Sequence, residues 1–309
     1  MKQPLYDMRF SILIFSLLGF SFRSSAQCCS ANPVAGSVNV GTLTKKTFRT
    51  ITFYRYNSFS KYYTGFHYSD FDSLKNVNSN FLGSLLAYGI SNKITFEAQT
   101  GYYINKSEIV NTQPPYTIKG WGLSNGVASV KYNIFKKNEI ELAAGVGVKF
   151  PFAKEQQSTG GVILPQSVQP CTGALGGVGQ LFLSKTWTEK SVRIFLIHRT
   201  EINGTNSVKY KTGDFHSTSL FVSKSFNKRW TLLLQSTYEN RGRDILNNKT
   251  IDASGGYFIF LSPQINYTIA EKWNISALTG IRLYWHYNGT QIGNQGFTVS
   301  LTRDFQLGE

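Results

Sequence analysis

Apolar and polar residues alternate along most of this chain, in runs of about twelve residues that exceed the usual strand length. The clearest run is Tyr257–Ile269. Ile259 and Ile265 lie on its apolar face and Gln264 lies on its polar face. Because successive side chains of a strand point to opposite sides, such a run predicts a strand with one apolar and one polar face. Pro263 interrupts the run and predicts a local bulge.

A second long run, Lys272–Tyr287, shows the same alternation. It predicts Leu283 and Trp285 on the apolar face and Arg282 and His286 on the polar face.

Alternation predicts about twelve such strands, following one another along the chain. The predicted strands are Thr47–Phe59, Val77–Tyr88, Lys93–Ile104, Gly120–Ile134, Glu139–Phe150, Thr172–Lys185, Ser191–Ile202, Asp214–Phe226, Arg229–Glu239, Gly255–Ile269, Lys272–Tyr287 and Gln295–Phe305.

Short polar turns and long loops alternate between these strands. The short turns each join an apolar or aromatic residue to a nearby Lys: Tyr88–Lys93, Asn133–Asn138, Lys185–Lys190, Ser225–Trp230 and Thr268–Trp273. Short turns on one side and long loops on the other are typical of outer-membrane barrels, whose even strand number leaves both ends on the short-turn side. We therefore predict an all-β fold, a closed antiparallel up-and-down transmembrane β-barrel of about twelve strands.

A β-propeller is the alternative architecture, because a repeat of about 40–45 residues also matches its blades. A blade needs four short strands with about four turns per repeat. Each repeat here has two long strands and one long loop, which favours the barrel.

Composition agrees with a membrane barrel. Aromatic residues make up 15% of the chain and charged residues 16%, against roughly 25% charged in ordinary soluble domains. The net charge of +15 suggests a polyanionic partner, but the basic residues are scattered and many lie in the short turns. Lysines there meet anionic lipid headgroups. We expect membrane lipids as a partner and no nucleic acid.

The first 26 residues predict a secretory signal peptide. Lys2 and Arg9 form its basic region, Phe10–Phe20 its apolar core and Ser24–Ala26 its small-residue cleavage site. We expect an exported protein of a Gram-negative outer membrane, with residues 27–46 as a flexible lead-in or a plug and 47–309 as the barrel.

The cysteines are Cys28, Cys29 and Cys171. An odd number leaves one thiol unpaired or bound to another molecule. Adjacent cysteines bind soft metals in some proteins, but no His or third Cys lies near this pair in sequence. We expect no metal and no cofactor. A lipoprotein acylated at Cys28 is the weaker alternative, because Gln27 and Ser25 do not match a lipobox.

Catalytic motifs are scarce. The histidines His67, His198, His216 and His286 stand apart, with no zinc-binding spacing among them. Two His-x-Ser/Thr segments, His67-Tyr68-Ser69 and His216-Ser217-Thr218, place both groups on one side of a strand. An outer-membrane lipid hydrolase is therefore an alternative function, although we expect no enzyme.

Charged and amide residues on the polar faces are the candidate lumen lining and solute pathway: Arg49, Arg55, Glu97, Gln99, Lys131, Glu141, Lys149, Arg193, Arg199, Gln235, Gln264, Arg282 and His286. Arginine predominates, which favours anionic or neutral polar solutes. Inward-facing aromatic residues suit aromatic solutes instead: Phe53, Phe195, Phe258 and Phe260. We expect a channel or transporter for small polar or aromatic solutes. The alternative is a non-conducting barrel that binds protein partners through its loops or N-terminal segment.

Three segments carry a resemblance to a known group. They are Ser25-Ala26-Gln27, the start Cys28-Cys29-Ser30-Ala31-Asn32-Pro33, and the strand Arg49-Thr50-Ile51-Thr52-Phe53-Tyr54-Arg55-Tyr56. On these segments and its overall pattern, the chain resembles porin-like outer-membrane barrel proteins of Bacteroidota-type bacteria. It is also similar to the barrel family named for the phenol-degradation meta pathway. The resemblance implies a barrel that carries small organic solutes.

Overall fold

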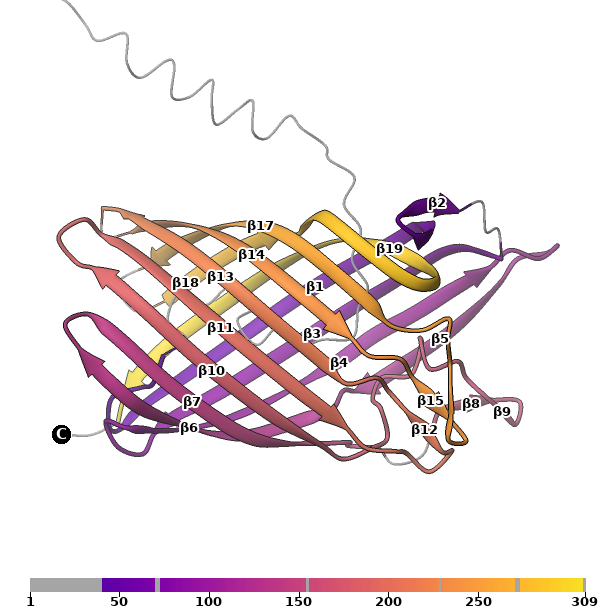
Figure 1. Cartoon of the computed structure of the whole chain (residues 1–309), viewed down its shortest axis with the longest axis horizontal. Coiled ribbons are helices and arrows are strands. Elements are labelled where there is room, and N and C mark those ends of the chain that lie inside the picture. Colours follow the sequence, from indigo (N-terminus) through magenta and orange to yellow (C-terminus); the bar gives the residue numbers. More distant parts are fainter. Residues whose placement is uncertain (1–40, 70–72, 154–155, 228, 270–272, 308–309) are drawn as a thin grey trace, which may run out of the picture.

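The computed structural model describes residues 41–69, 73–153, 156–227, 229–269 and 273–307. The described chain forms a closed antiparallel barrel of 12 strands (Figure 1). The predicted fold class is confirmed. The barrel wall consists of β1 (Thr47–Gly65), β3 (Leu74–Gly89), β4 (Ile94–Val110), β6 (Gly126–Lys137), β7 (Ile140–Phe150), β10 (Gly176–Trp187), β11 (Val192–Asn203), β13 (Phe215–Phe226), β14 (Trp230–Arg241), β17 (Gly256–Ile269), β18 (Trp273–Thr279) and β19 (Ile281–Gln306).

The last two strands of the wall do not correspond one to one to β18 and β19, because β19 contributes to both. β18 and the first part of β19 together ascend beside β17, and the rest of β19 descends beside β1. The pairing of β1 with β19, from Thr47↔Gln306 upward, closes the ring. Closure gives the backbone N–H and C=O groups of every wall strand a partner, which a lipid environment requires.

The wall is taller than the alternation predicted on the side of β1 to β4. β1 continues past Phe59 because Tyr62 and Tyr63 pair with the descending part of β19. β4 continues to Val110, where it pairs with β5 (Tyr116–Leu123). Parts of two predicted long loops are therefore strand. Short strands lie in the long loops at the end of the barrel to which β1 and β4 extend: β2 (His67–Ser69), β8 (Ser158–Thr159), β9 (Val162–Ile163), β12 (Tyr210–Lys211), β15 (Ile245–Leu246) and β16 (Lys249–Thr250).

The short turns lie at the opposite end (Figure 1). Asn138 and Glu139 both have positive φ, 51° and 62°, and connect β6 to β7 as a two-residue hairpin. The Thr188 hydroxyl and amide donate hydrogen bonds to the Glu139 carboxylate and lower its pKa. Asn227 has φ 57°, and its side-chain oxygen accepts from the backbone N–H of Arg229 and of Trp230.

The outward face of the wall is apolar and exposed. Its large exposed side chains include Leu82, Leu86, Phe96, Val130, Val146, Leu181, Leu220, Leu232, Leu234, Ile265, Ile275, Leu283, Val299 and Leu301. Such a face needs a hydrocarbon environment, because soluble proteins rarely expose a continuous apolar surface of this extent. No helix within the described ranges is long and apolar enough to cross a bilayer.

The irregularity predicted at Pro263 lies on the neighbouring strand instead. Pro263 sits in regular register opposite Leu234 of β14, so β17 has no bulge there. On its other side, the partner strand is interrupted at Gly280, between β18 and β19. Proline has no N–H to donate, so one hydrogen bond of the ladder is missing at Pro263, and the interruption falls on the partner strand.

Candidate solute pathway along the inner wall

The polar faces of the strands line the inside of the barrel. Almost all of the predicted lining residues lie there. Buried inward positions hold Arg49, Gln99, Lys131, Glu141, Lys149, Arg199, Gln235, Gln264 and Arg282, and half-buried ones hold Arg55, Glu97 and Arg193. These placements are geometric, and their role in solute passage stays a prediction.

His286 is the exception. The register of β19 against β17 shifts between Ile259↔Tyr284 and Phe260↔Arg282, which leaves Leu283 as an extra residue. One inserted residue reverses every side chain beyond it. His286 therefore lies on the outer face, 5.2 Å from the ring centre of Tyr257, and is removed from the lining. Trp285, predicted outside, points inward for the same reason and packs against the Phe258 and Tyr287 cluster.

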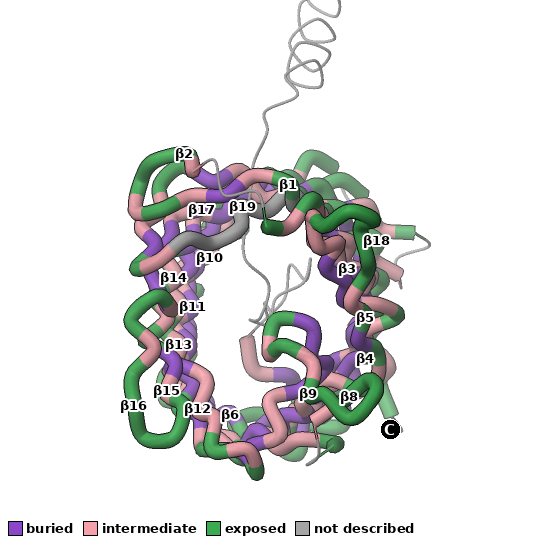
Figure 2. Tube along the Cα trace, turned by 90° about the vertical axis from the view of Figure 1, so that its right-hand side faces the viewer, coloured by how far each residue is buried: buried purple, intermediate pink, exposed green. Residues whose placement is uncertain are grey.

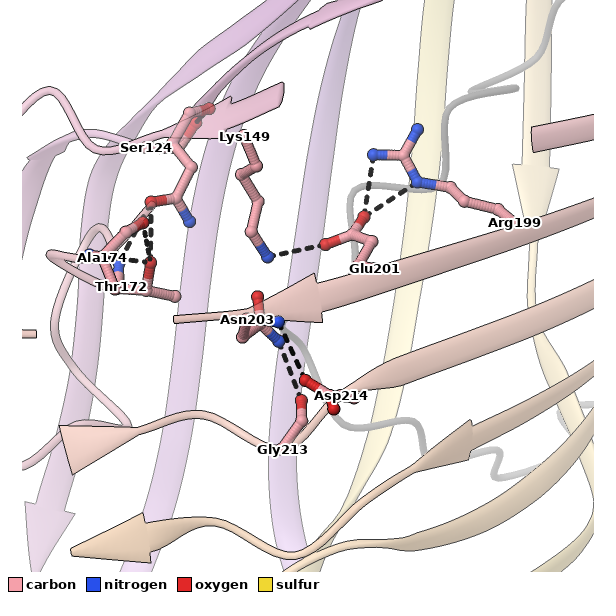
Figure 3. Close-up of polar contacts among 10 residues, drawn as sticks. Ser124, Lys149, Thr172, Ala174, Arg199, Glu201, Asn203, Gly213 and Asp214 are labelled. Atoms are coloured by element: carbon pink, nitrogen blue, oxygen red, sulfur yellow. Dashed lines mark hydrogen bonds and ion pairs between the residues drawn. The ribbon is translucent and has the colours of Figure 1, made fainter. Parts of the chain in front are cut away.

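A buried ion triad crosses the upper inner wall (Figure 3). The Lys149 Nζ atom donates to Glu201 Oε2 at 2.8 Å, and Arg199 Nε donates to Glu201 Oε1 at 2.8 Å. The three side chains are 5 to 8% exposed. Glu201 was not among the predicted lining residues. Its sequence position indicates the inner face, because it lies an even number of residues from Arg193 and Arg199 on β11.

Two further ion pairs link adjacent wall strands. Lys131 on β6 reaches Glu97 on β4 at 2.7 Å. Arg49 on β1 donates through Nε and Nη2 to both carboxylate oxygens of Asp304 on β19, each at 2.6 Å. The second pair lies across the closing seam. Much of the predicted inner charge is thus neutralised within the wall.

The segment before β1 runs along the inside of the barrel at its short-turn end. The Thr42 amide and hydroxyl donate to Glu141 Oε1 at 2.9 and 3.0 Å. The Leu43 amide donates to Thr95 Oγ1 at 2.8 Å, and the Leu43 side chain packs in a buried cluster with Phe53 and neighbours. Glu141 therefore binds residues of the chain itself. The earlier part of the predicted lead-in, residues 27–40, lies outside the described residues, as does the predicted signal peptide.

The long loop between β7 and β10 also contacts the inner wall. Figure 2 views the barrel from the long-loop end, and the loop carrying β8 and β9 lies within the outline of the ring. Lys106 Nζ donates to the buried Gln169 carbonyl at 2.8 Å, and Val168 is fully buried. Lys106 points inward because β4 carries an extra residue at Ile104 against β3. The sequence pattern contains no signal for that insertion.

Aromatic rings occupy three places on the inner wall. Phe195 and Phe221 stack with ring centres 4.3 Å apart, and the Arg193 guanidinium lies 5.6 and 5.3 Å from the ring centres of Phe182 and Phe195. Phe53 and Phe81 form a second cluster, and Phe258, Phe260 and Tyr287 a third. All the aromatic residues predicted to face inward are buried there.

The histidines lie outside this pathway. His198 Nδ1 and Nε2 contact Thr218 and Thr200 at 2.9 and 3.1 Å, and His216 Nδ1 contacts Thr200 at 3.1 Å, on the outward face of β11 and β13. No carboxylate among the described residues forms an ion pair with either ring. A hydrolase triad needs a third group that orients the base. No cluster of metal-binding side chains occurs within the described residues.

Solved barrel structures resemble this chain to different degrees. The COG4313 outer membrane channel from Pseudomonas putida F1 superposes with a TM-score of 0.67 at 12% identity, over 86% of this chain and 97% of that one. The KdgM porin matches with a TM-score of 0.46 at 9% identity, over 82% and 99% of the two chains. The NanC porin matches at 0.47 and 11% identity, over 83% and 98%.

No protein-family model and no curated protein sequence matches the chain. The closed barrel with an apolar outer wall is the fold of outer-membrane β-barrel proteins of Gram-negative bacteria.

Proposed function

We propose that the protein is an outer-membrane channel that passes small polar or aromatic solutes through its lumen. The observation that carries the proposal is the inner wall, where charged, amide and aromatic side chains replace the apolar residues of the outer wall. The fold shared with a known outer-membrane channel supports it. The affiliation with barrels of Bacteroidota-type bacteria, and with the family named for the phenol-degradation meta pathway, is part of this proposal.

Basic side chains outnumber acidic ones among the inward-facing residues, so the channel prefers anions over cations. Arg193 contributes to this preference because it lies on the inner wall, near the short-turn end of β11. Binding of protein partners through the long loops or the N-terminal segment is the second candidate, and it predicts a sealed barrel.

The direct test is conductance. We expect the refolded protein to give discrete current steps in planar lipid bilayers, with a reversal potential in a KCl gradient that indicates anion preference. Solute uptake measured by liposome swelling checks the same point with uncharged solutes. A refolded barrel that neither conducts ions nor admits small sugars would overturn the proposal and favour the partner-binding alternative.

A charge-reversal pair checks the pathway. Arg193→Glu should lower the anion-to-cation permeability ratio by about two-fold or more, because it changes the sign of a charge inside the lumen. Arg303→Glu is the matched control, since Arg303 lies on the outer face against the rings of Trp273 and Phe305. Equal effects of the two substitutions would show that the current does not pass the inner wall near Arg193.

A further inference from the structure

Arg282 lies inside a group of aromatic rings in the half of the lumen nearer the long loops. Its guanidinium carbon is 5.8 Å from the ring centres of Phe258 and Phe260, and 5.6 Å from those of Trp285 and Tyr287. Arg282 is 8% exposed. We call these five residues the Arg282 cage.

The donors of the cage lack acceptors. Nε, Nη1 and Nη2 of Arg282 and Nε1 of Trp285 make no hydrogen bond to any described residue. The hydroxyls of Tyr287 and Tyr63 lie close enough to act electrostatically on the guanidinium, and Glu239 does so more weakly. The Tyr287 hydroxyl is also a weak hydrogen-bond partner of the guanidinium, but it leaves none of the three nitrogens with a well-formed hydrogen bond.

Cation–π contacts use the faces of the rings and stabilise the positive charge, but they leave the in-plane N–H groups unsatisfied. A buried charged group with unmade hydrogen bonds is costly. Two other arginines of the inner wall differ in this respect. Arg49 forms a bidentate pair with Asp304, and Arg199 donates to Glu201. Arg282 alone of these three keeps a planar fork of donors directed into an aromatic environment.

The geometry points to a binding site for a small organic anion, an aromatic carboxylate, in the Arg282 cage. The carboxylate accepts hydrogen bonds from the guanidinium fork, and the Trp285 N–H supplies a further donor. The ring of the solute packs against Phe258 and Phe260 in the tilted arrangements that aromatic pairs prefer. An inorganic anion uses only the fork, and a neutral aromatic solute uses only the rings. The assignment rests on the proposed channel function only for the route by which the solute arrives.

The test is equilibrium binding to the full refolded barrel in detergent micelles, with sodium benzoate as the probe in isothermal titration calorimetry. Benzyl alcohol has the ring without the charge, and acetate has the carboxylate without the ring. We expect benzoate to bind at least about 10-fold more tightly than either compound, because only benzoate satisfies both halves of the cage.

Two variants and a control locate the site. Arg282→Gln should weaken benzoate binding by about 10- to 100-fold, the loss expected for charge-assisted hydrogen bonds. Trp285→Phe keeps a ring but removes its N–H, and should weaken binding several-fold. Arg303→Gln is the control, because Arg303 also lies over two rings and has an unpartnered Nε, but it faces outward at the short-turn end. It should leave benzoate affinity unchanged.

The outcomes separate this site from the channel itself. Equal affinity for benzoate and benzyl alcohol, or an unchanged benzoate affinity in both Arg282→Gln and Trp285→Phe, would overturn the site even if the protein conducts. Benzoate binding that depends on Arg282 in a barrel without conductance would support the site and overturn the channel.

Discussion

Replacing Glu201 by alanine should destabilise the barrel by about 3–5 kcal/mol, the cost of breaking a buried ion pair from one side. Glu201 is the shared acceptor of Lys149 and Arg199, and all three side chains are almost fully buried. Its removal leaves two positive charges close together without an anion. The change is measured as the free energy of unfolding in urea, with the refolded protein in lipid vesicles and tryptophan fluorescence as the signal.

An exposed ion pair provides the matched control. Asp252 pairs with Arg243 at 2.9 Å, but the two side chains are 83% and 50% exposed. Asp252→Ala should therefore cost less than about 1 kcal/mol. Adding Lys149→Met to Glu201→Ala should recover part of the loss, because it removes one of the two uncompensated charges. A cost for Glu201→Ala no larger than that for Asp252→Ala would mean that water reaches and solvates the triad.

The strands of the barrel wall can be predicted from the alternation of apolar and polar residues, because that alternation depends only on residues close together in sequence. Successive side chains of a strand point alternately to lipid and to the lumen. The two faces of β1 and β17 can therefore be assigned from residues such as Phe53 and Gln264. The alternation also indicates the short turns, since a hairpin of two or three residues leaves little choice of pairing. The alternation gives the wrong face where an inserted residue reverses the side chains beyond it.

Those insertions, at Leu283 and Ile104, are a matter of register between strands. A bulge changes which residues oppose each other without changing the composition of either strand, so its effects on His286 and Lys106 are absent from the pattern. The contacts of the Thr42 segment and of the loop around Gln169 with the inner wall were also not predicted. They depend on hydrogen bonds between residues distant in sequence, which alternation does not encode.

Glycines facing the lumen let aromatic rings lie flat on the wall, and one of them is a sharp test of packing. Phe53 on β1 is directly opposite Gly83 on β3, and a Cβ placed on Gly83 would overlap the tip of the Phe53 ring. The tip of the Phe81 ring likewise lies over Gly101 of β4, although Phe81 is paired with Tyr103. The Phe53 ring is 2% exposed and packs against Ile51, so it has little room to move aside.

Gly83→Val should therefore destabilise the barrel by about 1–3 kcal/mol through overpacking, measured by the same urea unfolding. Gly177→Ala is the control on the same kind of strand, because nothing lies within 4 Å of a Cβ at that position. It should be neutral or slightly stabilising, since alanine restricts the unfolded chain. Combining Gly83→Val with Phe53→Leu should cost less than the sum of the two single changes, because the smaller side chain makes room for the valine. Strict additivity would mean that the Phe53 ring does not pack against position 83.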